Sequence, residues 1–206
     1  MQVKLLHVTP EHVINDAISQ PYNQNSSNEL TRKVIGVKKH LSCAEHVIMN
    51  WNIEGISRLC LQELVRHRIA SLTVKSSRYT LKELKQIHKL DVHFVKPEHL
   101  NQDKEMWFID QAIEEIYKHV LKSYSDCFEF CKVNKSLSKL NERFKYAIPE
   151  GLRTSLTYSM NLRSFINLLE LRTSGDAHFE IRILANKLRE SLDNTYVNQL
   201  LLDLGF

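Results

Sequence analysis

The stretch Arg66–Tyr79, which reads RHRIASLTVKSSRY, organises the chain. Residues 66–89 contain seven Lys or Arg and a single acid, Glu83, while the rest of the chain contains 21 basic and 23 acidic residues. The excess positive charge is therefore local. Guanidinium groups pair bidentately with phosphate and stack on aromatic rings, so this order of arginines and serines suits a planar anionic ligand. The alternative is a solvated basic face, the usual fate of a charge run.

The order of residues favours a ligand site. The tripeptide Arg66–Arg68, then seven residues, then Ser76, with Arg-Tyr at 78–79, form the motif of the flavin-dependent thymidylate synthases. The chain resembles this family over nearly its whole length, because His40–His46 and Asn161–Arg172 fall in the family's order and spacing. The resemblance implies the thymidylate synthase-complementing protein fold and a homotetramer whose flavin sites form between subunits.

Length and composition predict a globular protein. With 206 residues and 43% hydrophobic content, the chain is long enough to bury a core as one domain over 1–206, with or without a helical insertion. No run approaches eighteen apolar residues, and the N-terminus is too soon polar for a signal peptide, so we expect a cytoplasmic protein without a membrane segment. The net charge of +4 would also suit RNA, but no nucleic-acid-binding motif appears.

The cysteines and most histidines carry no predicted chemistry. The four cysteines lack C-x-x-C spacing, so we infer neither a metal site nor a disulfide, and we expect Cys127 and Cys131 to be buried on one helix face. His88, His93 and His99 are expected at the surface. Asp176 is assigned no role.

The hydrophobic pattern predicts the elements that position the motif. Residues 46–54 alternate like a half-buried strand, and a helix from Ser57 delivers Arg66 at its end. Val3–Val8 predicts a strand, with Thr9 as the N-cap and Pro10 as the first residue of the next helix. Further helices are expected over 28–40, 81–88, 102–124 and 161–171, with the stretch 89–96 irregular.

Strands and helices alternate along the chain without a repeated βαβ pattern. This order predicts an α+β fold, with a mostly antiparallel sheet and helices packed on it. The chain has no G-x-G-x-x-G sequence and no P-loop, so no Rossmann crevice is expected.

The resemblance assigns site residues by position. The implied FAD contacts are Ser42, Arg66, His67, Arg68, Asn161, Arg163 and Asn167, with His40 close by. Without the resemblance, the cluster at 161–167 would be ordinary helix capping.

The implied dUMP contacts are Glu63, Arg66, Val74, Lys75, Ser76, Ser77, Arg78, Lys145 and Arg172. The family commonly has Glu at position 74 and Gly at position 77, so Ser77 is expected to adopt a backbone geometry usually given to glycine. Glu63 stands where glutamine is frequent. Lys145 stands where the family frequently has arginine. Lysine keeps the positive charge but lacks the guanidinium group that can pair bidentately with an anion.

The resemblance implies reductive methylation of dUMP to dTMP, with methylenetetrahydrofolate as carbon donor, NADPH as reductant and FAD as redox relay. Arg172 would polarise the pyrimidine, so no cysteine nucleophile is needed. From the residues alone, Arg172 would instead be a favourable cation in the last turn of a helix. Two alternatives stay open, a non-catalytic nucleic-acid-binding protein and a related flavoenzyme acting on another uracil compound.

Overall fold

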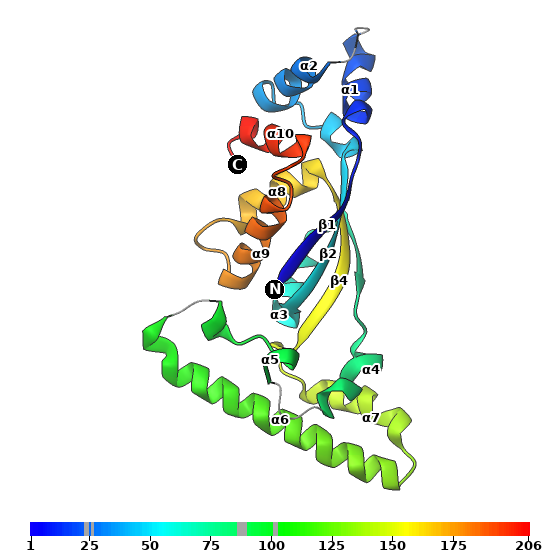
Figure 1. Ribbon diagram of the computed structural model, residues 1–206, viewed down its shortest axis with the longest axis vertical. Coiled ribbons are helices and arrows are strands. Elements are labelled where there is room, and N and C mark those ends of the chain that lie inside the picture. The colour runs from blue at the N-terminus through cyan, green and yellow to red at the C-terminus, as the bar shows by residue number, and fades with distance from the viewer. Residues whose placement is uncertain (23–24, 26, 86–89, 101–102) are drawn as a thin grey trace. The chain divides into compact units, whose positions relative to one another are not determined.

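The computed structural model describes residues 1–22, 25, 27–85, 90–100 and 103–206 (Figure 1). The strands are β1 (Gln2–Val8), β2 (Ile48–Ser57), β3 (Ala70–Val74) and β4 (Arg153–Asn161). The α-helices are α1 (Glu11–Ser19), α2 (Asn28–Arg32), α3 (Arg58–Leu64), α4 (Ser77–Thr80), α5 (Leu90–His93), α6 (Trp107–Val133), α7 (Leu137–Phe144), α8 (Leu162–Arg172), α9 (Phe179–Glu190) and α10 (Tyr196–Leu204). Short 3₁₀ turns are η1 (Gln20–Tyr22), η3 (Cys43–His46), η4 (Leu81–Lys85), η5 (Pro97–His99), η6 (Lys104–Met106) and η7 (Lys145–Ala147), and η2 (Lys33–Val37) is a π-helix.

The chain forms two compact units. Unit 1 comprises Met1–Glu54, Glu63–Thr73 and Leu156–Phe206, and unit 2 comprises Gly55–Gln62 and Val74–Ser155. The expected single domain over residues 1–206 stays a prediction.

The sheet is antiparallel, with strand order β1-β2-β4-β3. β1 pairs with β2 with a register shift between Leu5 and His7. The Leu162 amide at the end of β4 donates to the Val47 carbonyl at the start of β2, at 2.8 Å. This confirms the predicted α+β class.

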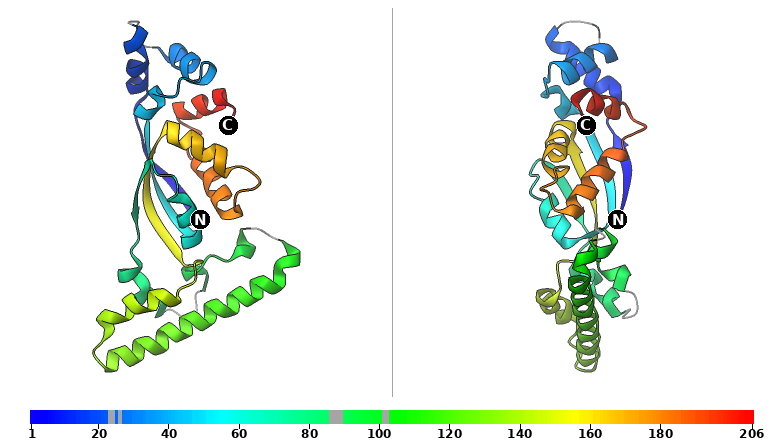
Figure 2. Two further views of the ribbon diagram at one scale, coloured as in Figure 1. Left: turned by 180° about the vertical axis from the view of Figure 1, so that it is seen from behind. Right: turned by 90° about the vertical axis from the view of Figure 1, so that its left-hand side faces the viewer.

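The core of unit 1 lies between the sheet and the helices α8, α9 and α10, which cover one face (Figures 1 and 2). Four alternating side chains before and within β2 have no exposed surface: Val47, Met49, Trp51 and Ile53. This confirms the predicted alternation, since successive strand residues point to opposite faces. The Trp51 ring lies 5.3 Å from that of Phe165 on α8, between centroids, and Trp51 Nε1 donates to Ser191 Oγ at 2.9 Å.

The predicted start of the first helix is wrong by one residue. Helix α1 begins at Glu11, and Pro10 is its N-cap without a side-chain hydrogen bond. The Thr9 hydroxyl instead accepts from the Ile48 amide at 2.8 Å and donates to the Ile48 carbonyl at 3.2 Å. The hydroxyl therefore extends the pairing of β1 with β2.

The helix expected over 28–40 is shorter and ends in a π-helix. Arg32 Nε and Nη2 donate to the two carboxylate oxygens of Asp203 on α10, at 2.7 and 2.8 Å. A Cβ on Gly36 would lie 2.6 Å from the Asp203 Cβ, so this approach requires glycine. Lys39 has a φ of 54°, which is not compatible with a right-handed helix, so the helix ends before this residue, at Val37.

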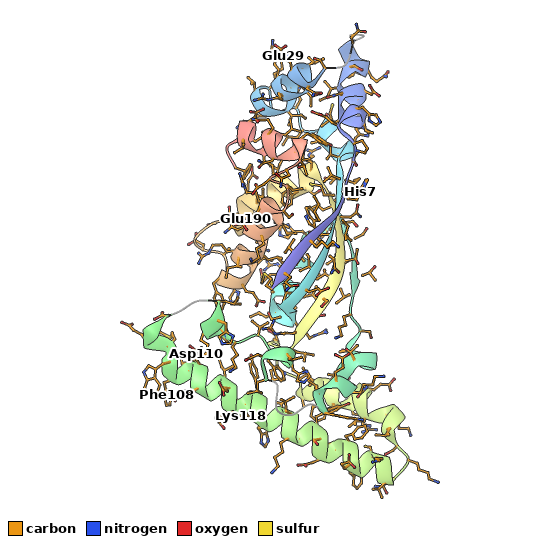
Figure 3. All side chains as sticks on the ribbon, in the orientation of Figure 1. His7, Glu29, Phe108, Asp110, Lys118 and Glu190 are labelled. Carbon is orange, nitrogen blue, oxygen red and sulfur yellow. The ribbon has the colours of Figure 1, made fainter. Side chains whose placement is uncertain are left out.

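In unit 2, helix α6 is longer than predicted at its C-terminal end. No glycine or proline interrupts residues 107–133, so the helix continues past Tyr124. The predicted start at residue 102 lies outside the described residues. The apolar stripe expected as core or subunit interface (Trp107, Ile109, Ala112, Ile113, Ile116, Val120 and Leu121) is buried only in its later part, where Val120 and Leu121 are 8% and 0% exposed. Trp107, Ile109 and Ile116 are more than half exposed, as is Phe108 next to Trp107 (Figure 3).

Three further expectations in unit 2 change. The stretch expected to be irregular contains α5, and His93 is buried because Phe94 next to it pairs with Leu152 and stacks on Tyr117. Residues 81–85 form a 3₁₀ turn, and residues 86–89 lie outside the described part of the chain, His88 included. His99 is exposed, as expected.

Cys127 is exposed, contrary to expectation, while Cys131 is partly buried. The buried stripe of α6 continues from Tyr124 through Phe128 to Cys131, at i+4 and i+7, and this phase turns Cys127 outward.

Candidate active site

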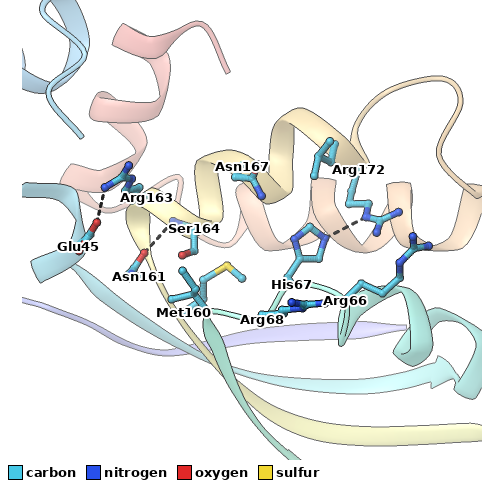
Figure 4. Close-up of a pocket in the computed structure, with 12 residues that line it drawn as sticks. Glu45, Arg66, His67, Arg68, Met160, Asn161, Arg163, Ser164, Asn167 and Arg172 are labelled. Atoms are coloured by element: carbon cyan, nitrogen blue, oxygen red, sulfur yellow. Dashed lines mark hydrogen bonds and ion pairs between the residues drawn. The ribbon is translucent and has the colours of Figure 1, made fainter. Parts of the chain in front are cut away.

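Unit 1 contains a cavity of about 780 Å³ between η3, the segment after α3, the end of β4 and helix α8 (Figure 4). It is lined by Glu45, Arg66, His67, Arg68, Ile69, Met160, Asn161, Arg163, Ser164, Asn167, Leu171 and Arg172. The structure therefore brings together two of the segments predicted to contact FAD, 66–68 and 161–167, with Arg172.

Helix α8 presents its polar face to this cavity because its apolar face is buried. Phe165 and Leu169 are at most 1% exposed. Arg163, Asn167 and Leu171 follow at i, i+4 and i+8, so they lie above one another on one side of the helix. The helix therefore carries the cavity residues in a row.

The first turn of α8 is capped by a predicted site residue. Asn161 Oδ1 accepts a hydrogen bond from the Ser164 amide at 2.8 Å, which satisfies one free donor of the helix start. Asn161 thus has the capping role that the sequence left open, and it lines the cavity as well.

The opposite wall comes from the segment after α3. The His67 amide donates to the Leu64 carbonyl at 3.2 Å, which continues the helical turn by one residue. The His67 side chain is buried, with 7% exposed, while its neighbours Arg66 and Arg68 are exposed. The tripeptide therefore directs the histidine inward and both arginines toward solvent.

Arg172, the last residue of α8, is held by two partners. Its Nε donates to His67 Nε2 at 3.0 Å (Figure 4), and its Nη1 donates to Glu63 Oε2 at 2.8 Å. Its Nη2 lies 3.5 Å from the Glu63 carbonyl oxygen, and only 15% of the side chain is exposed. The guanidinium is therefore fixed, which a helix-dipole role alone would not require.

Burial lowers the pKa of His67 from its ordinary value of 6.5, and the positive charges of Arg172 and Arg66 lower it further. The Glu63 carboxylate opposes this shift. A lowered pKa means that His67 is neutral at pH 7. Because Nε2 accepts from Arg172, the ring proton resides on Nδ1.

The cavity is electropositive. Four of its lining residues are arginines and one, Glu45, is an acid. Arg163 pairs with Glu45, and both side chains are at least half exposed. Arg68 and Asn167 have no hydrogen-bond or ion-pair partner among the described residues, so their donors are available to a ligand.

Several predicted residues lie outside this cavity. His40 and Ser42 are exposed just before and at the start of η3 and do not line it. Ser76 is the N-cap of α4, and Ser77 is its first residue. The described chain has positive φ at non-glycine residues only at Lys39 and Lys135, so Ser77 does not adopt the left-handed geometry.

The remaining predicted dUMP contacts belong to unit 2. Lys75 Nζ pairs with Glu83 at 2.8 Å, Val74 ends β3, and Lys145 is exposed at the start of η7. The position of the Arg78 backbone in α4 is described, whereas its side chain lies outside the described part.

The apolar part of the lining was not predicted from the sequence. Ile69 and Leu171 are 70% and 54% exposed, and the buried Met160 also lines the cavity. Exposed aliphatic side chains beside free donors offer a surface to a planar ring. The i, i+4, i+8 spacing from Arg163 to Leu171 was the available signal for one of them.

Among the described residues, no group of three or more His, Cys, Asp or Glu is arranged to hold a metal ion. No helix in the same part of the chain has the length and apolarity needed to cross a membrane.

Comparison with known proteins gives one consistent family. The family model described as "Thymidylate synthase complementing protein" matches residues 4–196. The flavin-dependent thymidylate synthase of Wolinella succinogenes is 41% identical over 164 residues, covering 80% of this chain and 76% of that protein. The enzyme of the same name from Helicobacter pylori strain J99 is 36% identical over 204 residues, covering 93% of each chain.

A solved structure agrees. The crystal structure of thymidylate synthase X from Helicobacter pylori with FAD and dUMP is similar over 100% of both chains, with a TM-score of 0.80 and 32% identity. The chain therefore belongs to the flavin-dependent thymidylate synthase family.

Proposed function

We propose that this protein converts dUMP to dTMP, with methylenetetrahydrofolate as carbon donor, NADPH as reductant and FAD as bound cofactor. The observation that carries this proposal is the cavity of unit 1. It combines a fixed guanidinium at one end of α8, namely Arg172, with displaceable or free polar groups toward the other end, namely Arg163 and Asn167. The proposal is supported by the relatives, which are named flavin-dependent thymidylate synthases, and by the structural neighbour, which was solved with FAD and dUMP.

The residues present fit FAD. The ligand is an anionic dinucleotide with a planar ring, and the cavity offers four arginines, exposed aliphatic side chains and unpaired donors on Arg68 and Asn167. We propose that Arg66, His67, Arg68, Asn161, Arg163 and Asn167 hold it, with Ser42 and His40 near the same site. When bound, FAD supplies the redox relay between NADPH and the one-carbon unit.

Arg172 would act on the pyrimidine of dUMP. A guanidinium has five N–H donors. Three of these are directed at His67 and Glu63, which leaves two for the uracil. Donation to a uracil carbonyl stabilises negative charge on the imide and leaves C5 nucleophilic, so the carbon is methylated without attack by a protein thiol. None of the four cysteines lines the cavity.

The phosphate of dUMP needs a separate clamp. We propose that Ser76, Ser77 and Arg78, with Val74, Lys75, Glu63, Arg66 and Lys145, complete the dUMP site, and that some of them come from another copy of the chain in a cytoplasmic homotetramer. Light scattering of the active protein tests the assembly. A fully active monomer would contradict it.

The test of function is dUMP-dependent oxidation of NADPH by the purified protein with FAD and methylenetetrahydrofolate. We expect yellow protein, or protein that titrates with FAD, and NADPH consumption that stops when dUMP is omitted. Colourless protein that does not bind FAD would contradict the proposal. A nucleic-acid-binding protein would instead bind RNA with a steep dependence on salt.

A further inference from the structure

Glu63 lies near two arginines of the cavity, Arg66 and Arg172, and its carboxylate is closer to Arg172. Its Oε2 accepts from Arg172 Nη1 at 2.8 Å, whereas Arg66 Nη1 lies 3.4 and 3.5 Å from the two carboxylate oxygens. The Arg66 side chain is 68% exposed and that of Arg172 is 15% exposed. Glu63 therefore binds Arg172 firmly and leaves Arg66 free to turn.

Glu63 meets Arg172 with two groups rather than one. The carboxylate takes Nη1, and the backbone carbonyl of the same residue lies 3.5 Å from Nη2. His67 takes Nε from the other side at 3.0 Å. All three nitrogens of the guanidinium are thus oriented by the protein, so the plane of the group is set before any ligand arrives.

We propose that Glu63 is a positioning residue for Arg172. By accepting from Nη1, its carboxylate directs the two remaining N–H donors of the guanidinium toward the place where the uracil ring binds. This inference rests on the proposed function for the identity of the ring, and on the contacts among Glu63, His67 and Arg172 for the geometry.

The physical reason for such a residue is the length of the arginine side chain. An arginine at the end of a helix has many rotamers and, in an electropositive cavity, would turn away from its neighbours Arg66 and Arg68. A carboxylate at 2.8 Å holds it against that repulsion. Misplacement of a catalytic group by about 1 Å can cost on the order of a hundredfold in rate, so orientation matters more here than added affinity.

Two substitutions separate positioning from other roles. Glu63→Ala removes the acceptor, and Glu63→Gln keeps an oxygen acceptor at the same reach without the charge. Glu170→Ala is the matched control, because Glu170 is an exposed carboxylate in the last turn of α8 that does not line the cavity. For each FAD-loaded protein, kcat, the KM for dUMP and the bound FAD per chain are measured.

We expect Glu63→Ala to lower kcat about tenfold or more and to raise the KM for dUMP by a smaller factor, because Glu63 is also one of the proposed dUMP contacts. Glu63→Gln should recover kcat to within about threefold of the parent, and Glu170→Ala should match the parent. FAD content should be equal in all four proteins. The proposal is overturned if Glu63→Ala keeps the parent kcat, if Glu63→Gln falls as far as Glu63→Ala, or if Glu63→Ala loses FAD together with activity.

A second measurement does not depend on the reaction. In protein labelled with ¹⁵N-arginine, the Arg172 Nη1–H signal, assigned by its loss in Arg172→Lys, should be protected from solvent exchange in the parent and in Glu63→Gln, because Glu63 accepts from Nη1. It should broaden or exchange rapidly in Glu63→Ala. A protected signal in Glu63→Ala would overturn the inference. If the parent makes no dTMP, the proposed function fails, and this measurement still decides whether Glu63 orients Arg172.

Discussion

The two ends of helix α8 carry the same kind of side chain in different states. At the C-terminal end, Arg172 is 15% exposed and held by Glu63 and His67. Near the N-terminal end, Arg163 is 55% exposed and pairs with Glu45, which is 50% exposed. An exposed pair contributes little free energy and is readily exchanged, whereas the enclosed one is fixed by several partners.

From this difference we expect the two arginines to have different roles in one cavity, Arg163 in cofactor binding and Arg172 in activation of the substrate. A displaceable guanidinium suits binding, because a cofactor carrying phosphate or a polar ring edge can replace Glu45 at small cost. A fixed guanidinium suits chemistry, because its donors are oriented before charge develops on the substrate. Arg163 and Arg172 are nine residues apart on α8, which separates these two proposed roles by about 14 Å at 1.5 Å per residue.

The largest expected effect comes from the fixed end. Arg172→Lys keeps the positive charge but cannot reach Glu63 and His67 with a planar fork and also donate to the substrate. We expect kcat for dTMP formation to fall on the order of a hundredfold, as for a removed oxyanion donor, while FAD binding survives. Steady-state kinetics and flavin absorbance of the folded variant measure both. An Arg172→Lys protein as active as the parent would show that the activating residue lies elsewhere.

A smaller effect is expected at the displaceable end. Arg163→Gln removes one charge from an exposed, paired position, so FAD should bind up to about fivefold more weakly, within the range measured for exposed ion pairs. At saturating FAD, kcat should equal that of the parent. Fluorescence titration of FAD and turnover at saturation test this. A fall in kcat that saturating FAD does not restore would break the distinction between the two ends.

The fixed end should also show a pH dependence of stability. The pKa of His67 is lowered in the folded protein, so the unfolded chain binds the proton more tightly. The contribution of the His67–Arg172 contact to the free energy of unfolding is therefore fully present above about pH 6.5 and is lost as the pH falls through the lowered folded value.

Urea unfolding of the parent and of His67→Gln between pH 8 and pH 5 measures this contribution. Glutamine can accept from Arg172 and does not titrate, so the difference between the two proteins isolates the histidine. We expect the parent to lose stability relative to the variant as the pH falls. A difference that is constant with pH, or that moves the other way, would contradict the assignment of a neutral His67.

The smallest effects are expected from the thiols, which lie outside both ends of the cavity. Replacing Cys43, Cys60, Cys127 or Cys131 singly by Ala should leave turnover within about tenfold of the parent. Because Cys60 has no exposed surface, Cys60→Ala should lower the free energy of unfolding by about 1 kcal/mol. Because Cys127 is exposed, Cys127→Ala should leave the free energy of unfolding unchanged within error. Turnover and thermal unfolding check both statements. A folded, flavin-loaded Cys variant without turnover would require a thiol in the mechanism.

Local sequence patterns were sufficient to predict many of the strands and helices. The alternation from Val47 to Ile53 specified a half-buried strand because side-chain direction in a strand depends only on sequence position. The helix expected over 161–171 is α8, Leu162–Arg172, within one residue at each end. The phase of α6 beyond Tyr124 was not predicted, since the helix continues past the expected end, and Cys127 is turned outward as a result.

Only some of the predicted site residues line one cavity, and the contacts among them were not predictable from the sequence. The motif spacing named Arg66–Arg68 and Asn161–Arg172, and these segments line one cavity. The contact between Glu63 and Arg172 joins residues 109 positions apart, and its existence depends on how two helix ends meet in space. No local pattern contains that information, and the same holds for the lining role of Ile69.

Release of tritium from [5-³H]dUMP measures whether uridylate bound in this cavity is methylated at C5, as we propose. With the FAD-loaded protein, NADPH and methylenetetrahydrofolate, we expect tritium to enter water in step with dTMP formation, because the methyl group replaces the C5 hydrogen. Tritium retained on the nucleotide by protein that has bound FAD would contradict the claim and indicate a flavoenzyme acting on another uracil compound.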